Sequence, residues 1–121
     1  MKLVRAEIET PALRAFLLTV EDLASSSLVR TEVPRACRRA DPALVPLGEL
    51  TIDSISTLVD IDGQLLHDAA EVEPPLLRSL DALHLATARR LQPDLMGMIT
   101  YDDRLADAAS AYGMEVVSPG R

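Results

Sequence analysis

Three acidic residues stand where a parallel sheet would place its chemistry. Glu32 lies about one turn into a predicted helix that follows an apolar strand, Asp81 lies in the first turn of another helix, and Asp102 directly follows a second apolar strand. In open α/β sheets, sites form outside the carboxyl ends of the strands, so these carboxylates are expected at one rim. Oxygen ligands suit Mg²⁺ or Mn²⁺, and the three acids could hold such a cation.

Each acid also has an ordinary structural explanation. Asp81 could simply face the positive end of its helix, Asp102 could be a helix cap, and Glu32 could lie on the surface. His84 lies one turn after Asp81 on the same face and could assist a site, although a partly buried structural histidine is the favoured interpretation. His67 is expected on the surface. The sequence has no glycine-rich phosphate loop and no Cys/His zinc spacing.

Strands and helices are predicted to alternate along the chain. Strands are expected over 23–27, 57–61, 95–100 and 115–117, and helices over 11–20, 28–40, 80–91 and 102–112. Residues 41–56 are expected to be helical, although their hydrophobic pattern is poor. A short helix is expected around Leu65, Leu66, Ala69 and Ala70, and it ends at Pro74-Pro75. Ser79 is expected to cap the 80–91 helix, with Leu80 and Leu83 facing inward. Apolar strands without clean alternation favour a parallel sheet covered on both faces, which is an α/β sandwich.

The composition indicates one domain, residues 1–121, with an aliphatic core. Hydrophobic residues make up 48% of the chain and aromatic residues only 2%. The single cysteine, Cys37, is expected to be a buried small side chain, and a chain without a disulfide fits a reducing cytoplasm. No apolar run approaches a membrane span and no signal peptide is evident, so we expect a cytoplasmic protein.

The net charge of −7 is unevenly distributed. Residues 1–40 carry seven basic and five acidic residues, whereas residues 41–121 carry five basic and fourteen acidic ones. A protein that binds RNA by charge alone should not have this balance. Most of the acids are expected to be solvated, while a few could converge on a divalent cation that bridges to phosphate.

Three segments resemble those that carry the acids of PIN-domain ribonucleases of the VapC toxin type. They are SSLVRTEVPRA at 26–36, RSLDALHLATA at 78–88 and ITYDDRL at 99–105, and the closing VVSPG also fits. The resemblance implies a three-layer α/β/α sandwich and metal-dependent RNA hydrolysis, with Glu32, Asp81 and Asp102 as catalytic residues and ligands of Mg²⁺ or Mn²⁺. It also implies supporting roles for Thr100, as a hydroxyl that orients a carboxylate or water, and for Asp103. The implied partners are RNA, a VapB-like antitoxin and a second copy of the chain.

One departure from the family pattern affects these expectations. The family opens with a short strand that ends in an Asp-Thr-Ser-type motif, and residues 1–7 resemble the helix after it, so no residue matches the first acid. Glu7 and Glu9 lie too far along that helix to replace it. We therefore expect the chain from Met1 to lack the first strand and to be inactive alone. The alternative is a catalytically inactive PIN-like protein that binds an antitoxin or partner; a HAD-like phosphatase is disfavoured because no nucleophilic aspartate motif follows an N-terminal strand.

Overall fold

The computed structural model describes residues 22–95 and 97–119, in which strands and helices alternate as expected. The elements are β1 (Ala24–Ser26), α2 (Val29–Ala40), η1 (Pro42–Leu44), α3 (Val45–Asp53), β2 (Thr57–Val59), α4 (Gly63–Glu71), α5 (Ser79–Leu91), η2 (Gln92–Asp94), β3 (Met98–Ile99), α6 (Asp103–Ala111) and β4 (Val116–Val117). The helix predicted over 11–20 lies outside the described residues. Within them, no helix is both long and apolar enough to cross a membrane.

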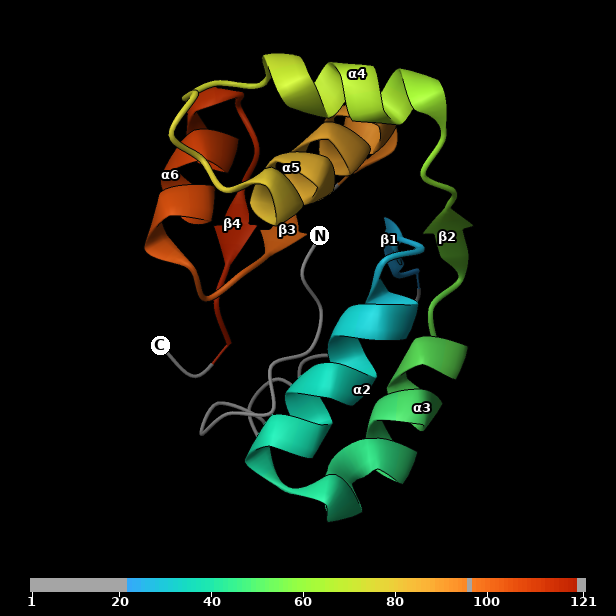
Figure 1. Ribbon diagram of the computed structural model, residues 1–121. Coiled ribbons are helices and arrows are strands. Elements are labelled where there is room, and N and C mark those ends of the chain that lie inside the picture. The colour runs from blue at the N-terminus through green and yellow to red at the C-terminus, as the bar shows by residue number, and fades with distance from the viewer. Residues whose placement is uncertain (1–21, 96, 120–121) are drawn as a thin grey trace.

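The strands pair in parallel, as the sequence predicted. β1 pairs with β2 in the register Ala24 to Thr57, and β3 pairs with β4 in the register Met98 to Val116. In the described residues these are two separate two-stranded sheets, and each strand is shorter than its apolar segment suggested. Figure 1 shows α4, α5 and α6 gathered with β3 and β4, while α2 and α3 form a hairpin beyond β1 and β2.

The direction of successive side chains in β3 shows how the layers are arranged. Met98 packs into a core built mainly from α4, α5 and α6. Its neighbour Ile99, together with Tyr101, packs into a second core that contains Val33 and Cys37 of α2. Because successive strand residues point to opposite faces, β3 separates two cores. Helices therefore cover both of its faces, which is the α/β layering predicted from the sequence.

A close helix crossing holds the α2–α3 hairpin together. α2 buries Val33 and Cys37 on its inner face, and Gly48 of α3 lies against both. A Cβ atom at Gly48 would lie 2.8 Å from Cys37 Sγ and 2.9 Å from Val33 Cγ1. Cys37 is thus the buried small side chain that was expected, and burial raises the pKa of its thiol.

Several local predictions were wrong. Ser79 is the first residue of α5 rather than its cap, and Arg78 at the cap position makes no side-chain capping bond. Leu80 is 50% exposed, although it was expected to face inward. In the short helix α4, Leu66 is 53% exposed and Ala70 is also exposed. Leu80 points outward because Asp81 and His84, one and four positions further along, occupy the inner face of α5.

Candidate functional site

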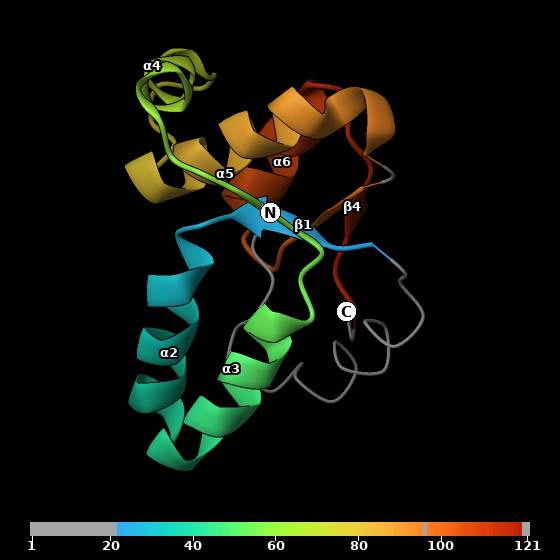
Figure 2. The same cartoon turned by 90° about the vertical axis from the view of Figure 1, so that its right-hand side faces the viewer.

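The beginning of α5 carries two polar side chains into the interior. Asp81 is 5% exposed and His84, one turn later on the same face, is fully buried. In Figure 2 this end of α5 lies on the side of the molecule toward which β1 runs. The first turn of a helix presents unpaired N–H groups and a partial positive charge, which favours a carboxylate there. An acid that only stabilises the start of a helix can lie on the surface, so this function alone does not explain the burial of Asp81.

Glu32 reaches the same place from α2. Its Oε1 lies 2.5 Å from Nε2 of His84, and its side chain is 24% exposed. This contact joins two helices across 52 residues of sequence. A hydrogen bond from a buried imidazole fixes the direction of the carboxylate, so Glu32 is held in position rather than free to move as a surface residue.

His84 is held mainly in its neutral form. Burial lowers the pKa of His84 from its ordinary value of 6.5, while the hydrogen bond to Glu32 and the nearby charges of Glu32 and Asp81 act in the opposite direction. Because burial is the largest effect, His84 donates Nε2–H to Glu32 as an uncharged ring. Asp81 precedes His84 by three residues, a spacing that places the two side chains on one face of α5.

Asp102 lies at the start of α6, directly after β3. Its Oδ1 accepts a hydrogen bond from the Leu105 N–H at 3.0 Å, so it is an N-cap, as its ordinary explanation anticipated. Thr100 is buried, and its Oγ1 accepts the Asp102 N–H at 3.1 Å, while Ser118 Oγ donates to the Thr100 carbonyl at 2.5 Å. The Thr100 hydroxyl therefore holds the backbone that carries Asp102. Asp103, the first residue of α6, is exposed.

The predicted residues are only partly brought together. Glu32 meets His84 beside Asp81, and Asp102 is positioned by a separate capping arrangement. Among residues 22–95 and 97–119, no group of three or more His, Cys, Asp or Glu side chains is placed to hold a metal ion. The carboxylate oxygens suit Mg²⁺ or Mn²⁺ in chemical type, but the three-acid metal site stays a prediction.

Two further buried polar residues lie on α5 and β1. His84 was interpreted as a structural histidine, although its three-residue spacing from Asp81 placed it on the same face. Ser26 lies in the strand predicted over 23–27 and ends β1 fully buried, and its hydroxyl has no hydrogen-bond partner in the described part of the chain. His67 is on the surface as expected, with its side chain 66% exposed and paired with Glu71.

Comparisons with known proteins identify the family. The PIN domain model matches residues 1–111. Three proteins of Mycobacterium tuberculosis are similar to this chain. Ribonuclease VapC46 is 41% identical over 98% of this chain and 91% of its own length, and Ribonuclease VapC35 is 38% identical over 100% of this chain and 92% of its own length. Ribonuclease VapC47 is 34% identical over 98% of this chain and 90% of its own length. No solved structure matches this chain. The family match and these long alignments show that the chain belongs to the PIN-domain family and is a relative of the VapC ribonucleases.

Proposed function

We propose that this protein is a VapC-like endoribonuclease that hydrolyses RNA phosphodiester bonds with the help of Mg²⁺ or Mn²⁺. The observation that carries the proposal is the contact between the buried His84 of α5 and the partly buried Glu32 of α2, with the buried Asp81 on the same face of α5 as His84. Extensive similarity to proteins named as ribonucleases supports it. The ligands we propose for the cation are Glu32, Asp81 and Asp102, with Asp103 as a supporting acid.

The residues of the chain would each contribute a defined part. When bound, a divalent cation would lower the pKa of a water molecule and stabilise negative charge on the phosphate. His84 directs the Glu32 carboxylate through its Nε2–H, and the first turn of α5 stabilises the Asp81 anion. Thr100 fixes the backbone at Asp102. These contacts set the position of each acid before RNA binds, which is how an enzyme avoids reorganisation during reaction.

The exchange Asp81→Asn tests the proposal most directly. It removes one negative charge but nearly preserves the shape of the side chain, so cleavage of RNA in Mg²⁺ or Mn²⁺ should fall on the order of a hundredfold or more, as expected when a reacting centre is misplaced. The matched control is Asp103→Asn, which changes an exposed acid of the same type and should have the smaller effect. Far-ultraviolet circular dichroism melts establish that both variants fold. RNA cleavage by Asp81→Asn at the wild-type rate would refute the assignment.

A catalytically inactive PIN-like protein that binds a partner is the second candidate. It is favoured by the lack, among the described residues, of a three-membered group placed for a metal ion. If RNA is cut in neither metal, by this chain or by a form extended upstream with the family's first strand, while the antitoxin still binds, this alternative is established. In both cases we propose a cytoplasmic homodimer whose antitoxin inserts an arginine toward Asp81 and Asp102, because a guanidinium can replace a cation by pairing with carboxylates.

A further inference from the structure

Helix α2 is strongly basic in a protein whose net charge is −7. Four of its twelve residues are arginines, and all four are exposed: Arg30, Arg35, Arg38 and Arg39. Its one acid is Glu32, which is held by His84. A local concentration of positive charge on an acidic protein marks a place where a polyanion can approach the surface.

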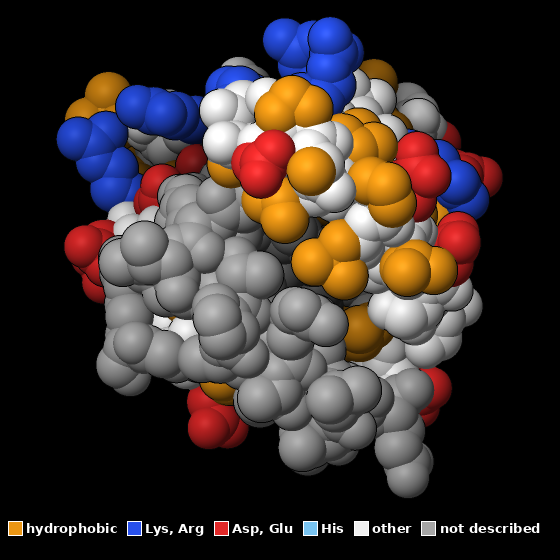
Figure 3. All heavy atoms as spheres, turned by 90° about the horizontal axis from the view of Figure 1, so that it is seen from below, with side chains coloured by type: hydrophobic (Ala, Val, Ile, Leu, Met, Phe, Trp, Pro, Cys, Tyr) orange, Lys and Arg blue, Asp and Glu red, His pale blue; other side chains and the backbone are white. Residues whose placement is uncertain are grey.

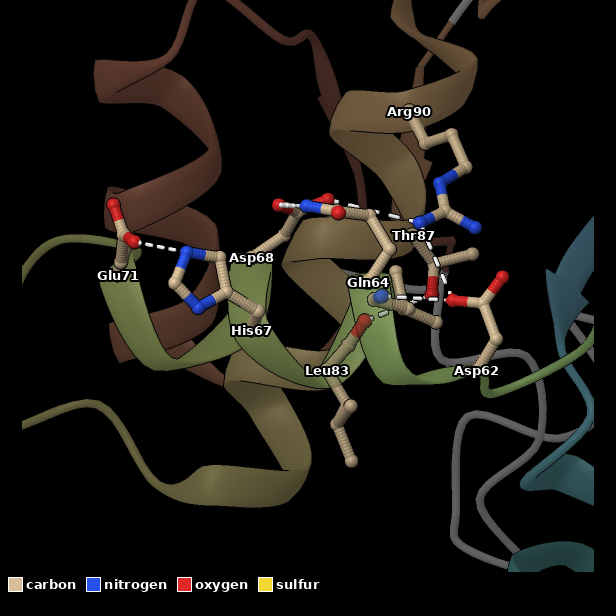
Figure 4. Close-up of polar contacts among 9 residues, drawn as sticks. Asp62, Gln64, His67, Asp68, Glu71, Leu83, Thr87 and Arg90 are labelled. Carbon is tan, nitrogen blue, oxygen red and sulfur yellow. Dashed lines mark hydrogen bonds and ion pairs between the residues drawn. The ribbon is translucent and has the colours of Figure 1, made fainter.

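The α2 arginines differ from those of α5 in their contacts. Arg89 stacks over the ring of Tyr112 at 4.1 Å, and Arg90 lies 3.6 Å from carboxylate oxygens of both Asp62 and Asp68 (Figure 4). In contrast, no hydrogen bond, ion pair or ring contact holds any α2 arginine in the described part of the chain. Their guanidinium groups therefore remain available to an external anion.

Helix stability explains only part of this pattern. Arg38 and Arg39 lie in the last turn, where the negative end of the helix dipole favours cations. Arg30 lies in the first turn, where the same dipole disfavours a positive charge, and Arg35 lies in the middle of the helix. Arginine is a favourable residue within a helix, so the stability of α2 argues against a cation only at Arg30.

Two of the arginines continue the face of α2 that carries Glu32. Arg35 and Arg39 follow Glu32 by three and seven residues, which are spacings that place side chains on one helix face. With a rise of 1.5 Å per residue, they stand about 4.5 and 10.5 Å further along the axis. Figure 3 views the molecule from the α2–α3 end and shows Lys and Arg side chains at the edge of the view.

We propose that Arg35 and Arg39 form a phosphate track that holds the RNA backbone on the side of α2 that leads to Glu32. The inference rests on the proposed function, since it supplies the substrate surface for that site. Guanidinium groups bind phosphate oxygens in bidentate fashion, and the acidic remainder of the surface repels RNA elsewhere. Phosphate contacts of this kind position a strand without reading its sequence.

The test measures binding separately from cleavage. In the Asp81→Asn background with EDTA present, a fluorescent single-stranded RNA oligonucleotide is titrated at several salt concentrations against Arg35→Gln/Arg39→Gln. Each lost phosphate contact should reduce the slope of log affinity against log salt by about 0.7, so the double variant should lose about 1.4. At about 50 mM salt its affinity should fall at least tenfold, since counterion release contributes several-fold per contact.

The matched control is Arg30→Gln/Arg38→Gln, which removes the same charge from other faces of the same helix. Its salt slope should stay close to that of the parent. Equal losses in the two double variants would overturn the track in favour of net charge, and no loss in either would overturn it outright. Poly-L-glutamate serves as a second probe: tight peptide binding that depends on Arg35 and Arg39, with RNA binding unchanged, would mark a site for an acidic protein instead.

Failure of the track and failure of the proposed function give different results. If the wild type cleaves RNA while Arg35→Gln/Arg39→Gln binds it normally, the track is wrong and the ribonuclease assignment survives. If RNA binding follows the track but the wild type cleaves nothing in Mg²⁺ or Mn²⁺, the catalytic assignment is wrong.

Discussion

Replacing His84 by glutamine should remove a defined part of the pH dependence of stability. His84 is fully buried, and burial lowers its pKa below the ordinary value of 6.5. In the unfolded chain the histidine takes up a proton near that value, whereas the folded state resists it. The unfolded state therefore binds more protons below pH 6.5, so the free energy of unfolding falls as the solution is acidified through this window and is fully present above it.

The size of this pH effect on stability corresponds to the uptake of one proton by His84 in the unfolded chain. Stability should fall by at most about 1.4 kcal/mol for each pH unit below 6.5, until the folded state also takes up the proton. Between about pH 7.5 and pH 5.5 the wild type should thus lose up to about 1.4 kcal/mol through His84 alone. Glutamine carries an N–H donor for Glu32 but does not titrate, so His84→Gln should lose this component whatever its absolute stability.

Urea denaturation at both pH values measures the difference, and the other histidine provides the control. His67→Gln changes an exposed side chain paired only with Glu71, and should retain the pH dependence of the wild type. Titration of the carboxylates is common to all three proteins and cancels in the comparison. If the wild type instead becomes more stable between pH 7.5 and 5.5 while His84→Gln does not, His84 is a cation in an ion pair with Glu32, and the argument from burial is refuted.

Two further predictions address the helices that position the site. Gly48→Ala should destabilise the protein by about 1–3 kcal/mol through overpacking against Cys37 and Val33, although alanine is favoured over glycine in a helix by about 1 kcal/mol. Urea denaturation measures the change, and adding Cys37→Ala should recover part of the lost stability. A Gly48→Ala variant more stable than the wild type would show that α2 and α3 can move apart to accommodate the methyl group. Asp102→Ala and Asp62→Ala each remove an N-cap, of α6 and α4, and each should cost about 1 kcal/mol. Only Asp102→Ala should also reduce RNA cleavage, and equal activity in the two variants would leave Asp102 as a cap alone.

The order of elements was predictable because it depends on local patterns. Hydrophobic spacing, Asp62 before α4 and Gly113 after α6 are signals that lie within a few residues of the structure they specify, and Gly113 adopts the positive φ of 84° that favours glycine. The outward rotation of Leu80 was not predictable by the same rule. Hydrophobicity favours a buried leucine, whereas the structure buries the neighbouring Asp81 and His84 and leaves Leu80 exposed.

The candidate acids were proposed from sequence motifs, whereas the contact between Glu32 and His84 was not predicted. Asp81 and His84 share a helix face by spacing, so their proximity could be read from the sequence. The hydrogen bond from His84 to Glu32 joins residues 52 positions apart, and it depends on the packing of α5 against β1, the strand that precedes α2. A similar limit applies to Ser26, whose burial depends on the strands and helices around β1 rather than on its neighbours in sequence.

The structural and catalytic explanations of the acids prove to be compatible. Asp81 lies in the first turn of α5 and Asp102 caps α6, so each carboxylate lies where a helix supplies partial positive charge. That partial charge is favourable for a carboxylate, whether the carboxylate only stabilises its helix or also binds a cation. The placement of Asp81 and Asp102 that suits each helix is therefore also compatible with the cation site proposed above. A position at a helix start was the ordinary structural interpretation of Asp81 and of Asp102 taken singly, and the same position suits an acid that binds a cation together with other acids.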